Sequence, residues 1–235
     1  MSNTTSPRTG GQILVDTLRL HGADRIFCVP GESYLAVLDA LLDAPDIAVT
    51  VCRQESGAAM MADAYARCTG RPGVCFVTRG PGATNASAGL HIAQQDSTPV
   101  ILFIGQIRRD TQEREAFQEI DYRRMLGPLT KWTAQIDDTA RIPEMVSRAY
   151  HNATAGRPGP VALALPEDML TETAAAPVAG PWRPGDHRGR PGGAGRAARA
   201  PRRRRTPLRP RRRRWLGRGR QCRPAPNSPR PGTCP

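Results

Sequence analysis

The sequence contains 235 residues and carries a formal net charge of +13 at neutral pH. The net positive charge comes from one end of the chain, because residues 183–235 hold 18 arginines, no lysine and one acid, for a net charge of +17. Residues 1–182 hold 16 basic and 20 acidic side chains, for a net charge of −4. Only this first part has the length and the apolar content to bury a core.

The composition also excludes several classes of protein. No stretch approaches the roughly 18 consecutive apolar residues of a membrane span, and the N-terminus has no apolar core of signal-peptide length. The six cysteines form no CxxC pair and no Cys/His cluster with the spacing of a zinc site. We therefore expect reduced thiols, no metal site within the chain, no membrane association and a cytoplasmic location.

Helical and strand patterns alternate along the first 170 residues. A helical apolar stripe covers residues 11–20, and an apolar strand follows at 25–29. Further helices are expected at 33–44, 55–69, 83–95 and 138–155, and further strands at 47–51, 73–78, 100–105, 131–136 and 161–166. Strands that are apolar throughout and separated by helices indicate a parallel sheet covered on both faces. The predicted fold class is α/β, with a parallel sheet of about six strands, helices on both faces and a disordered C-terminal tail.

The expected organisation has four parts. Residues 1–8 form a flexible N-terminus, 9–172 the α/β domain, and 173–182 a Pro-containing linker. Apolar periodicity stops after the linker, and Arg, Pro, Gly and Ala dominate residues 183–235. Such a composition cannot build a core, so we expect this tail to be disordered.

Three stretches that follow expected strands contain glycine or polar residues: Pro30-Gly31-Glu32, Arg53-Gln54-Glu55 and the segment 78–85. Ligands of an open parallel sheet bind beyond the carboxyl ends of its strands, so we expect these stretches to converge. Glycines before a helix can let backbone N–H groups approach an anion, although the spacing G-x-G-x-x-N is not that of a nucleotide-binding loop. The alternative is a Pro-Gly turn in which Thr84 or Asn85 caps the next helix.

Glu55 opens a helix that is rich in small residues. An acid in the first turn is favoured by the helix dipole by ~0.3 to 1 kcal/mol, which needs no functional explanation. The small residues indicate, in addition, that another backbone approaches closely, either in this chain or in a second subunit. A carboxylate at such a contact is partly desolvated, which brings its charged and neutral forms closer in free energy. The small residues are Gly57, Ala58, Ala59, Ala62, Ala64 and Ala66.

Five motifs occur in order along the chain: FCVPGES, RQESGAAMMADAYAR, VTRGPGATNA, QQDSTPVILFIGQ and AFQEIDYRRM. Together they resemble the N-terminal pyrimidine-binding domain of thiamine-diphosphate enzymes, and the acetolactate synthase group is the most similar. The resemblance covers residues 9–182. It implies a 2-keto acid carboligase or decarboxylase that binds thiamine diphosphate and acts on a small 2-keto acid. It also implies a homodimer or homotetramer for the intact protein. Part of the group carries FAD, so FAD is a possible second cofactor.

The resemblance implies that Glu55 is the catalytic residue. In the family, a glutamate at this position hydrogen-bonds N1′ of the aminopyrimidine and favours the imino tautomer, which deprotonates thiazolium C2. Gln118 is expected to reach toward reactant and cofactor, with Phe117 packed nearby; a surface glutamine is the alternative. The expected cofactor-binding residues are Pro30, Gly31, Glu55, Thr78, Pro81, Gly82, Asn85 and Gln118.

The diphosphate end of the cofactor has no expected site in this sequence. The family binds it through Mg²⁺ at a G-D-G motif with a downstream Asn-Asn, and only Gly185-Asp186-His187 comes near that pattern. Since the arginine-rich tail starts where a further domain is expected, we interpret it as an out-of-frame translation and the chain as truncated and inactive alone. Two alternatives stay open: a split subunit completed by the diphosphate-binding domain of another chain, and, less favoured, nucleic-acid binding through the arginine runs.

Overall fold

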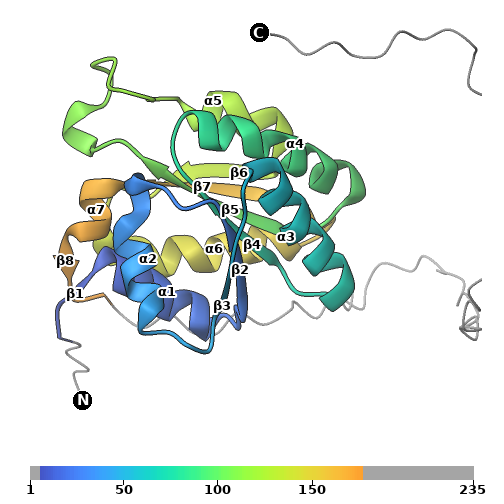
Figure 1. Ribbon diagram of the computed structural model, residues 1–235, viewed down its shortest axis with the longest axis horizontal. Helices are drawn as coiled ribbons and strands as arrows, with labels where there is room; N and C mark the ends of the chain where they lie inside the picture. Colours follow the sequence, from blue (N-terminus) through green and yellow to red (C-terminus); the bar gives the residue numbers. More distant parts are fainter. Residues whose placement is uncertain (1–5, 177–235) are drawn as a thin grey trace, which may run out of the picture. The chain divides into compact units, whose positions relative to one another are not determined.

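A computed structural model describes residues 6–176. They form a six-stranded parallel sheet with helices on both of its faces, which confirms the predicted fold class (Figure 1). The strand order is β3-β2-β4-β5-β7-β6. The tail expected from residue 183 onward lies outside the described residues. The six strands are β2 (Arg25–Cys28), β3 (Ala48–Val51), β4 (Gly73–Val77), β5 (Val100–Gln106), β6 (Trp132–Gln135) and β7 (Val161–Pro166).

Two hydrophobic cores lie on opposite faces of the sheet. Alternate strand residues divide between them: Phe76 and Phe103 belong to one core, and Cys75 and Leu102 to the other. One face is covered by α1 (Gly10–Leu20), α2 (Leu35–Leu42), α6 (Ile142–Thr154) and α7 (Glu167–Thr171). The other is covered by α3 (Glu55–Thr69), α4 (Pro81–Asp96) and α5 (Tyr122–Leu126).

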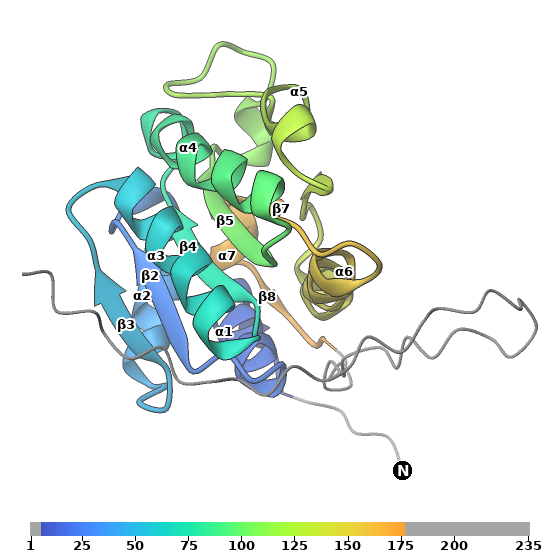
Figure 2. The same cartoon turned by 90° about the vertical axis from the view of Figure 1, so that its right-hand side faces the viewer.

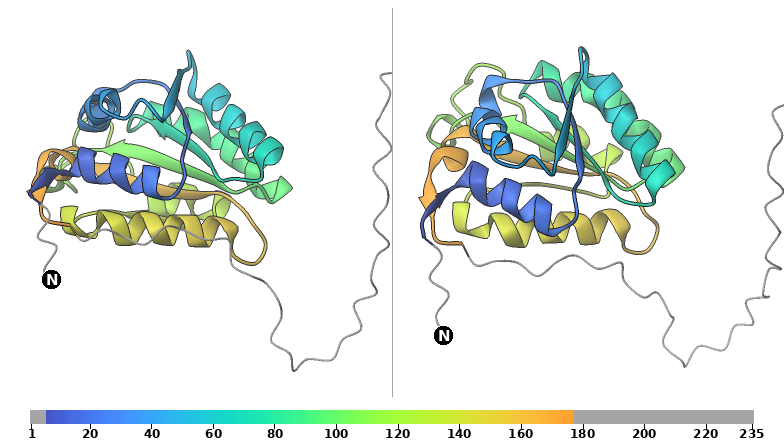
Figure 3. Two further views of the ribbon diagram at one scale, coloured as in Figure 1. Left: turned by 90° about the horizontal axis from the view of Figure 1, so that it is seen from below. Right: turned by 60° about the horizontal axis from the view of Figure 1, so that its bottom comes forward.

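The figures show the two helical layers from different sides. In Figure 2, α3 and α4 lie side by side along the sheet, and both views in Figure 3 show α1 beside α6 on the opposite face. β4, β5 and β7 are buried at every position between these layers, and their sequences are apolar except for Gln106 at the end of β5. No helix within the described range has the length and apolar character needed to cross a membrane.

Short elements complete the described part of the chain. β1 (Arg8–Thr9) pairs antiparallel with β8 (Thr173–Ala174). Residues 173–174, expected to begin a linker, are therefore strand residues of the folded domain. The 3₁₀ turns are η1 (Glu32–Tyr34), η2 (Arg109–Thr111), η3 (Gly127–Leu129) and η4 (Thr139–Arg141).

Two helix starts differ from the sequence expectation. The helix expected from residue 83 begins at Pro81, because proline is favoured at the first helical position, where its missing N–H is not needed. The segment expected as one helix over 138–155 is divided into η4 and α6. The first change matters for the site, since it places Pro81 and Gly82 on α4, together with Asn85, rather than in a loop before it.

Candidate functional site

The three stretches at the strand ends converge as predicted. β2 lies between β3 and β4, and Cys28 is in register with Val51 on one side and Phe76 on the other. All three strands are parallel, so the segments that follow them leave the sheet at the same edge. This edge brings together the segments that contain Gly31, Glu55 and Thr78.

Glu55 and Asn85 connect the starts of two helices. The Asn85 side chain donates Nδ2–H to Oε2 of Glu55 at 3.0 Å, and Ser56 Oγ donates to the main-chain oxygen of Asn85 at 2.6 Å. Glu55 is half-buried in this single chain. Among residues 6–176, its second oxygen, Oε1, has no hydrogen-bond partner. One carboxylate oxygen is thus fixed and the other is available.

Close packing of α3 against its neighbours explains the small residues. A Cβ added to Gly89 of α4 would lie 2.5 Å from Cβ of Ala59, and one added to Gly73 of β4 would lie 2.1 Å from the main-chain oxygen of Ala62. The second backbone predicted from the small residues is therefore supplied by α4 and β4 of this chain. Three large apolar side chains are exposed on α3 and α4: Met60, Met61 and Ile92.

Gly31 and Gly82 let the main chain pack closely against Thr78. A Cβ on Gly31 would lie 2.4 Å from Cβ of Thr78, so no larger residue fits there without movement of the backbone. A Cβ on Gly82 would lie 2.8 Å from Cγ2 of Thr78 and 3.7 Å from Oε1 of Glu55. Thr78 Oγ1 also hydrogen-bonds Ser33 Oγ at 2.8 Å. Oε1 of Glu55 and the side chain of Thr78 therefore both lie beside Gly82. We call the surface formed by Gly31, Glu55, Thr78 and Gly82 the crevice.

Gln118 packs against the start of α4. Gly80 has φ +57°, and a Cβ placed on it would lie 2.7 Å from Cβ of Gln118, which itself has φ +66°. The Gly80 N–H donates to Oη of Tyr122 at 2.9 Å. Burial raises the pKa of Tyr122 to about 12, so the phenol keeps its proton. Phe117, expected to pack beside Gln118, is instead 77% exposed.

The structure rejects one interpretation of the segment 80–85. Gly80 occupies the N-cap position without a side-chain cap, and neither Thr84 nor Asn85 caps the helix. Thr84 Oγ1 donates to the main-chain oxygen of Gly80 at 3.0 Å, and Asn85 binds Glu55. The alternative in which Thr84 or Asn85 caps the helix is wrong because α4 starts two residues earlier than its sequence pattern indicates. Pro30 and Pro81 are both exposed at this edge.

Sequence reasoning missed the environment of Arg79. Its residue exposure is 9%, and its guanidinium forms ion pairs with Glu32 at 2.7 Å and Glu167 at 3.1 Å. Glu32 follows β2 and Glu167 follows β7, so the arginine connects three segments at the carboxyl edge of the sheet. The available signal was a basic residue inside the motif VTRGPG, in a segment expected to converge with two others at the sheet edge.

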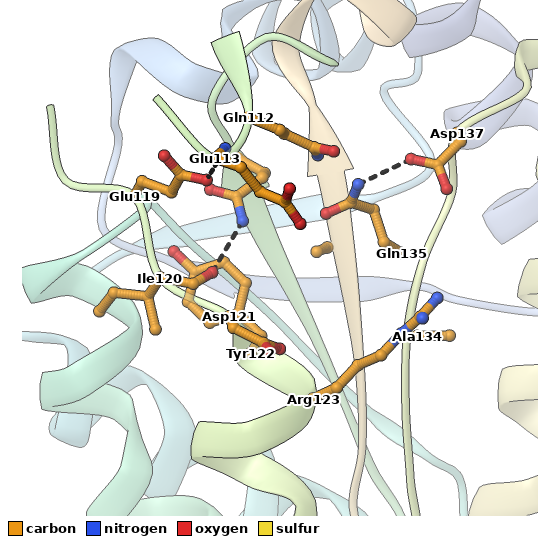
Figure 4. A pocket seen from close by; sticks show the side chains of 12 residues that line it. Gln112, Glu113, Glu119, Ile120, Asp121, Tyr122, Arg123, Ala134, Gln135 and Asp137 are labelled. Atoms are coloured by element: carbon orange, nitrogen blue, oxygen red, sulfur yellow. Dashed lines mark hydrogen bonds between the residues drawn. The ribbon is translucent and has the colours of Figure 1, made fainter. Parts of the chain in front are cut away.

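A polar cavity of about 310 Å³ lies beyond the ends of β5, β6 and β7. Figure 4 shows Gln112, Glu113 and Gln135 directed toward its interior. Gln135 Nε2 donates to Asp137 Oδ1 at 2.7 Å. Tyr122, the partner of Gly80, also lines this cavity, so the cavity adjoins the start of α4. No three His, Cys, Asp or Glu side chains within the described range are grouped so that they could hold a metal ion.

A family model described as "Thiamine pyrophosphate enzyme, N-terminal TPP binding domain" matches residues 8–125, a range that includes every expected site residue. The chain belongs to this family. Thiamine pyrophosphate is another name for thiamine diphosphate, so the family resemblance seen in the five motifs is confirmed.

Acetolactate synthases are among the similar proteins. The large subunit from Lactococcus lactis subsp. lactis is 42% identical over 70% of this chain and 29% of its own length. The acetolactate synthase of Arthrospira platensis is 43% identical over 68% of this chain and 28% of its own length. The mitochondrial catalytic subunit of Aspergillus candidus is 40% identical over 69% of this chain and 23% of its own length. The chain thus spans less than a third of the length of these relatives and is an acetolactate-synthase-like N-terminal domain.

Proposed function

We propose that the crevice between Gly31, Thr78, Gly82 and Glu55 binds the aminopyrimidine ring of thiamine diphosphate. The observation that carries this proposal is the carboxylate of Glu55, which Asn85 holds through Oε2 while Oε1 faces Gly82. A flat ring needs a space free of side chains, and a ring nitrogen needs a polar partner at its edge. Gly82 places no side chain beside Oε1 of Glu55, and Glu55 supplies the polar partner.

Glu55 would hold and move a proton at the pyrimidine nitrogen through Oε1. Asn85 keeps the carboxylate in one orientation, which lowers the entropy lost when the ring binds. When bound, the cofactor supplies the electron sink for making or breaking a bond next to a keto group. General acid–base catalysis of this kind typically contributes about 10² to 10⁴-fold to the rate.

The remaining expected residues would shape the crevice around the ring. Pro30 and Gly31 form the wall after β2, and Pro81 lies at the start of α4. Gln118, held against Gly80, would approach the reactant from the segment before α5. Because the relatives are acetolactate synthases, we propose 2-keto acids as substrates and carboligation as the reaction of the complete enzyme.

The diphosphate of the cofactor and its Mg²⁺ would be held by a domain other than this one. The described residues contain no suitable group of metal ligands, and the chain matches less than a third of each relative. We therefore propose that the 235-residue chain is inactive alone. A diphosphate-binding domain on a partner polypeptide would complete the site if the protein is a split subunit.

Assays of the purified 235-residue chain test this proposal. With pyruvate, thiamine diphosphate and Mg²⁺, we expect no acetolactate; acetolactate formation would show that the chain needs no partner. Affinity purification from the native host then tests for a diphosphate-binding partner, and its absence would exclude the split subunit. If a partner is recovered, the pair should form acetolactate, and Glu55→Gln should reduce the rate at least 100-fold.

The matched control for that assay is Glu144→Gln. Glu144 is an exposed acid that pairs with Arg141 on η4, on the face of the sheet opposite α3. This variant should retain the full rate of the pair. Equal losses in the two variants would show that the effect of Glu55→Gln is not specific to the crevice.

A further inference from the structure

We propose that Arg79 is a positioning residue that holds the crevice in shape by tying the segments after β2 and β7 to the segment after β4. Its role in ligand affinity rests on the proposed function, whereas its role in holding these segments does not. The contacts of Arg79 with Glu32 and Glu167 and those of its two chain neighbours support this inference.

The two ion pairs of Arg79 bridge segments that are far apart in sequence. Nη2 lies 2.7 Å from Oε1 of Glu32, and Nη1 lies 3.1 Å from Oε2 of Glu167. A guanidinium can bind two carboxylates at once because its donors form a rigid planar fork, whereas a lysine ammonium acts as a single point charge. Arginine is therefore suited to this position in a way that lysine is not.

Arg79 is also flanked by the residues that build the crevice. Thr78 contacts Gly31 and Ser33 on the β2 side, and Gly80 contacts Gln118 and donates to Tyr122 on the other. Glu32 directly follows Gly31. The ion pair between Arg79 and Glu32 thus joins the same two segments that pack against each other at Gly31 and Thr78.

A purely stabilising role predicts a different outcome from a positioning role. The arginine side chain is 10% exposed, but the side chains of Glu32 and Glu167 are 71% and 36% exposed. If Arg79 is replaced by methionine, both carboxylates can return to water and no buried charge is left without a partner. Because neither carboxylate is left buried and unpaired, the large cost of removing one member of a buried ion pair does not arise, and Arg79→Met should fold with little change in Tm.

Hydrogen exchange of the full 235-residue chain tests, without a ligand, whether Arg79 holds the three segments in place. The Tyr34 amide donates to the main-chain oxygen of Gly31 and reports on the segment after β2. The Gly80 amide donates to Oη of Tyr122, the Gly82 amide donates to the main-chain oxygen of Arg79, and both report on the segment after β4. In Arg79→Met, we expect these amides to exchange at least about tenfold faster while α6 is unchanged. Arg79→Lys should rescue part of the protection. Glu32→Gln, a change at an exposed side chain, should accelerate Tyr34 more than Gly80.

Two further measurements decide between the roles. Arg141→Met, which removes an exposed ion pair with Glu144, should leave exchange at the crevice unchanged. Titration with thiamine diphosphate and Mg²⁺, in the presence of the diphosphate-binding partner where one is recovered, should give about tenfold weaker binding for Arg79→Met than for the wild type. Unchanged exchange at Tyr34, Gly80 and Gly82 in Arg79→Met and Glu32→Gln would overturn the proposal, as would faster exchange throughout the domain with a lowered Tm.

The exchange data also separate this inference from the proposed function. If the wild-type chain binds no thiamine diphosphate even with a partner present, the proposed function fails. Faster exchange in Arg79→Met, confined to the crevice, would still support the positioning role of Arg79 in that case. The converse result is that Arg79→Met binds the cofactor tightly and shows the same amide exchange rates as the wild type. That result would support the proposed function and contradict the positioning role of Arg79.

Discussion

Asn85 donates a hydrogen bond to Glu55 across 3.0 Å and thereby joins the first turns of α4 and α3. These helices follow β4 and β3, which both end at the same edge of the sheet. The bond uses one oxygen of the carboxylate and orients the other toward Gly82. The amide of Asn85 therefore decides which oxygen of Glu55 a ligand can reach.

The substitution Glu55→Gln should weaken binding while preserving the fold. A glutamine oxygen can still accept from Asn85, so we expect to lose only the helix-dipole contribution, ~0.3 to 1 kcal/mol. For a domain of this size that lowers Tm by about 1 to 4 °C. The loss of a charge-assisted hydrogen bond, about 1.5 to 3 kcal/mol, should weaken thiamine-diphosphate binding by about 10 to 100-fold. Calorimetric titration, with the diphosphate-binding partner present where one is recovered, and thermal unfolding of the chain measure the two effects. An unaltered affinity would contradict the role of Glu55.

The substitution Gly31→Ala should disturb the contact between the two crevice segments. Its Cβ would lie 2.4 Å from Cβ of Thr78, which forces one of the segments to move. Overpacking of this kind typically costs about 1 to 3 kcal/mol, so we expect Tm to fall by roughly 2 to 12 °C. Gly57→Ala is the matched control, because its Cβ would meet only Oε1 of Gln54 at 3.9 Å. Similar Tm values for the two variants would show that Gly31 is not tightly packed against Thr78.

Much of the fold could be predicted because its strands are buried on both faces. Six apolar runs separated by helical patterns indicated the parallel sheet, but the insertion of β7 between β5 and β6 leaves no signal in the order of the sequence. Helices α5 and α7 were missed because five residues are too few to display a helical period. The strands β1 and β8 were missed because each has only two residues.

The candidate site was predicted to the extent that it follows neighbouring strands. Gly31, Glu55 and Thr78 could be placed at one edge from topology alone, because β3, β2 and β4 are adjacent. The partners of Arg79 could not, since Glu167 lies 88 residues away and reaches Arg79 only through the position of β7. The bond between Asn85 and Glu55 likewise depends on where α4 begins, and helix boundaries are weakly specified by sequence.

The substitution Tyr122→Phe should destabilise the start of α4. It removes the oxygen that accepts the Gly80 N–H in a buried place, and an unsatisfied buried donor costs about 1 to 3 kcal/mol. Thermal unfolding should therefore show a Tm lower by roughly 2 to 12 °C. Tyr65→Phe supplies the control, because the hydroxyl of Tyr65 binds Asp24 at an exposed position where water can replace it. A larger effect of Tyr65→Phe would argue against a buried role for Tyr122.

The buried His21 should make stability depend on pH in the mildly acidic range. Burial lowers the pKa of His21 from its ordinary value of 6.5, and its ring packs 4.7 Å from that of Tyr150. Below pH 6.5 the unfolded chain thus binds more protons at this residue than the folded chain. The free energy of unfolding is therefore unaffected by His21 above pH 6.5. It falls as the pH drops from 6.5 through the lowered pKa of the folded state, by at most about 1.4 kcal/mol per pH unit.

Urea unfolding at pH 7.5 and pH 5.5 measures this effect of His21. We expect the wild-type chain to lose more stability between the two values than His21→Gln, because carboxylates contribute equally to both proteins and cancel in the difference. His91→Gln is the control, since His91 is exposed and should leave the pH dependence as it is in the wild type. The same loss in the wild type and in His21→Gln would show that protonation of this ring does not oppose folding.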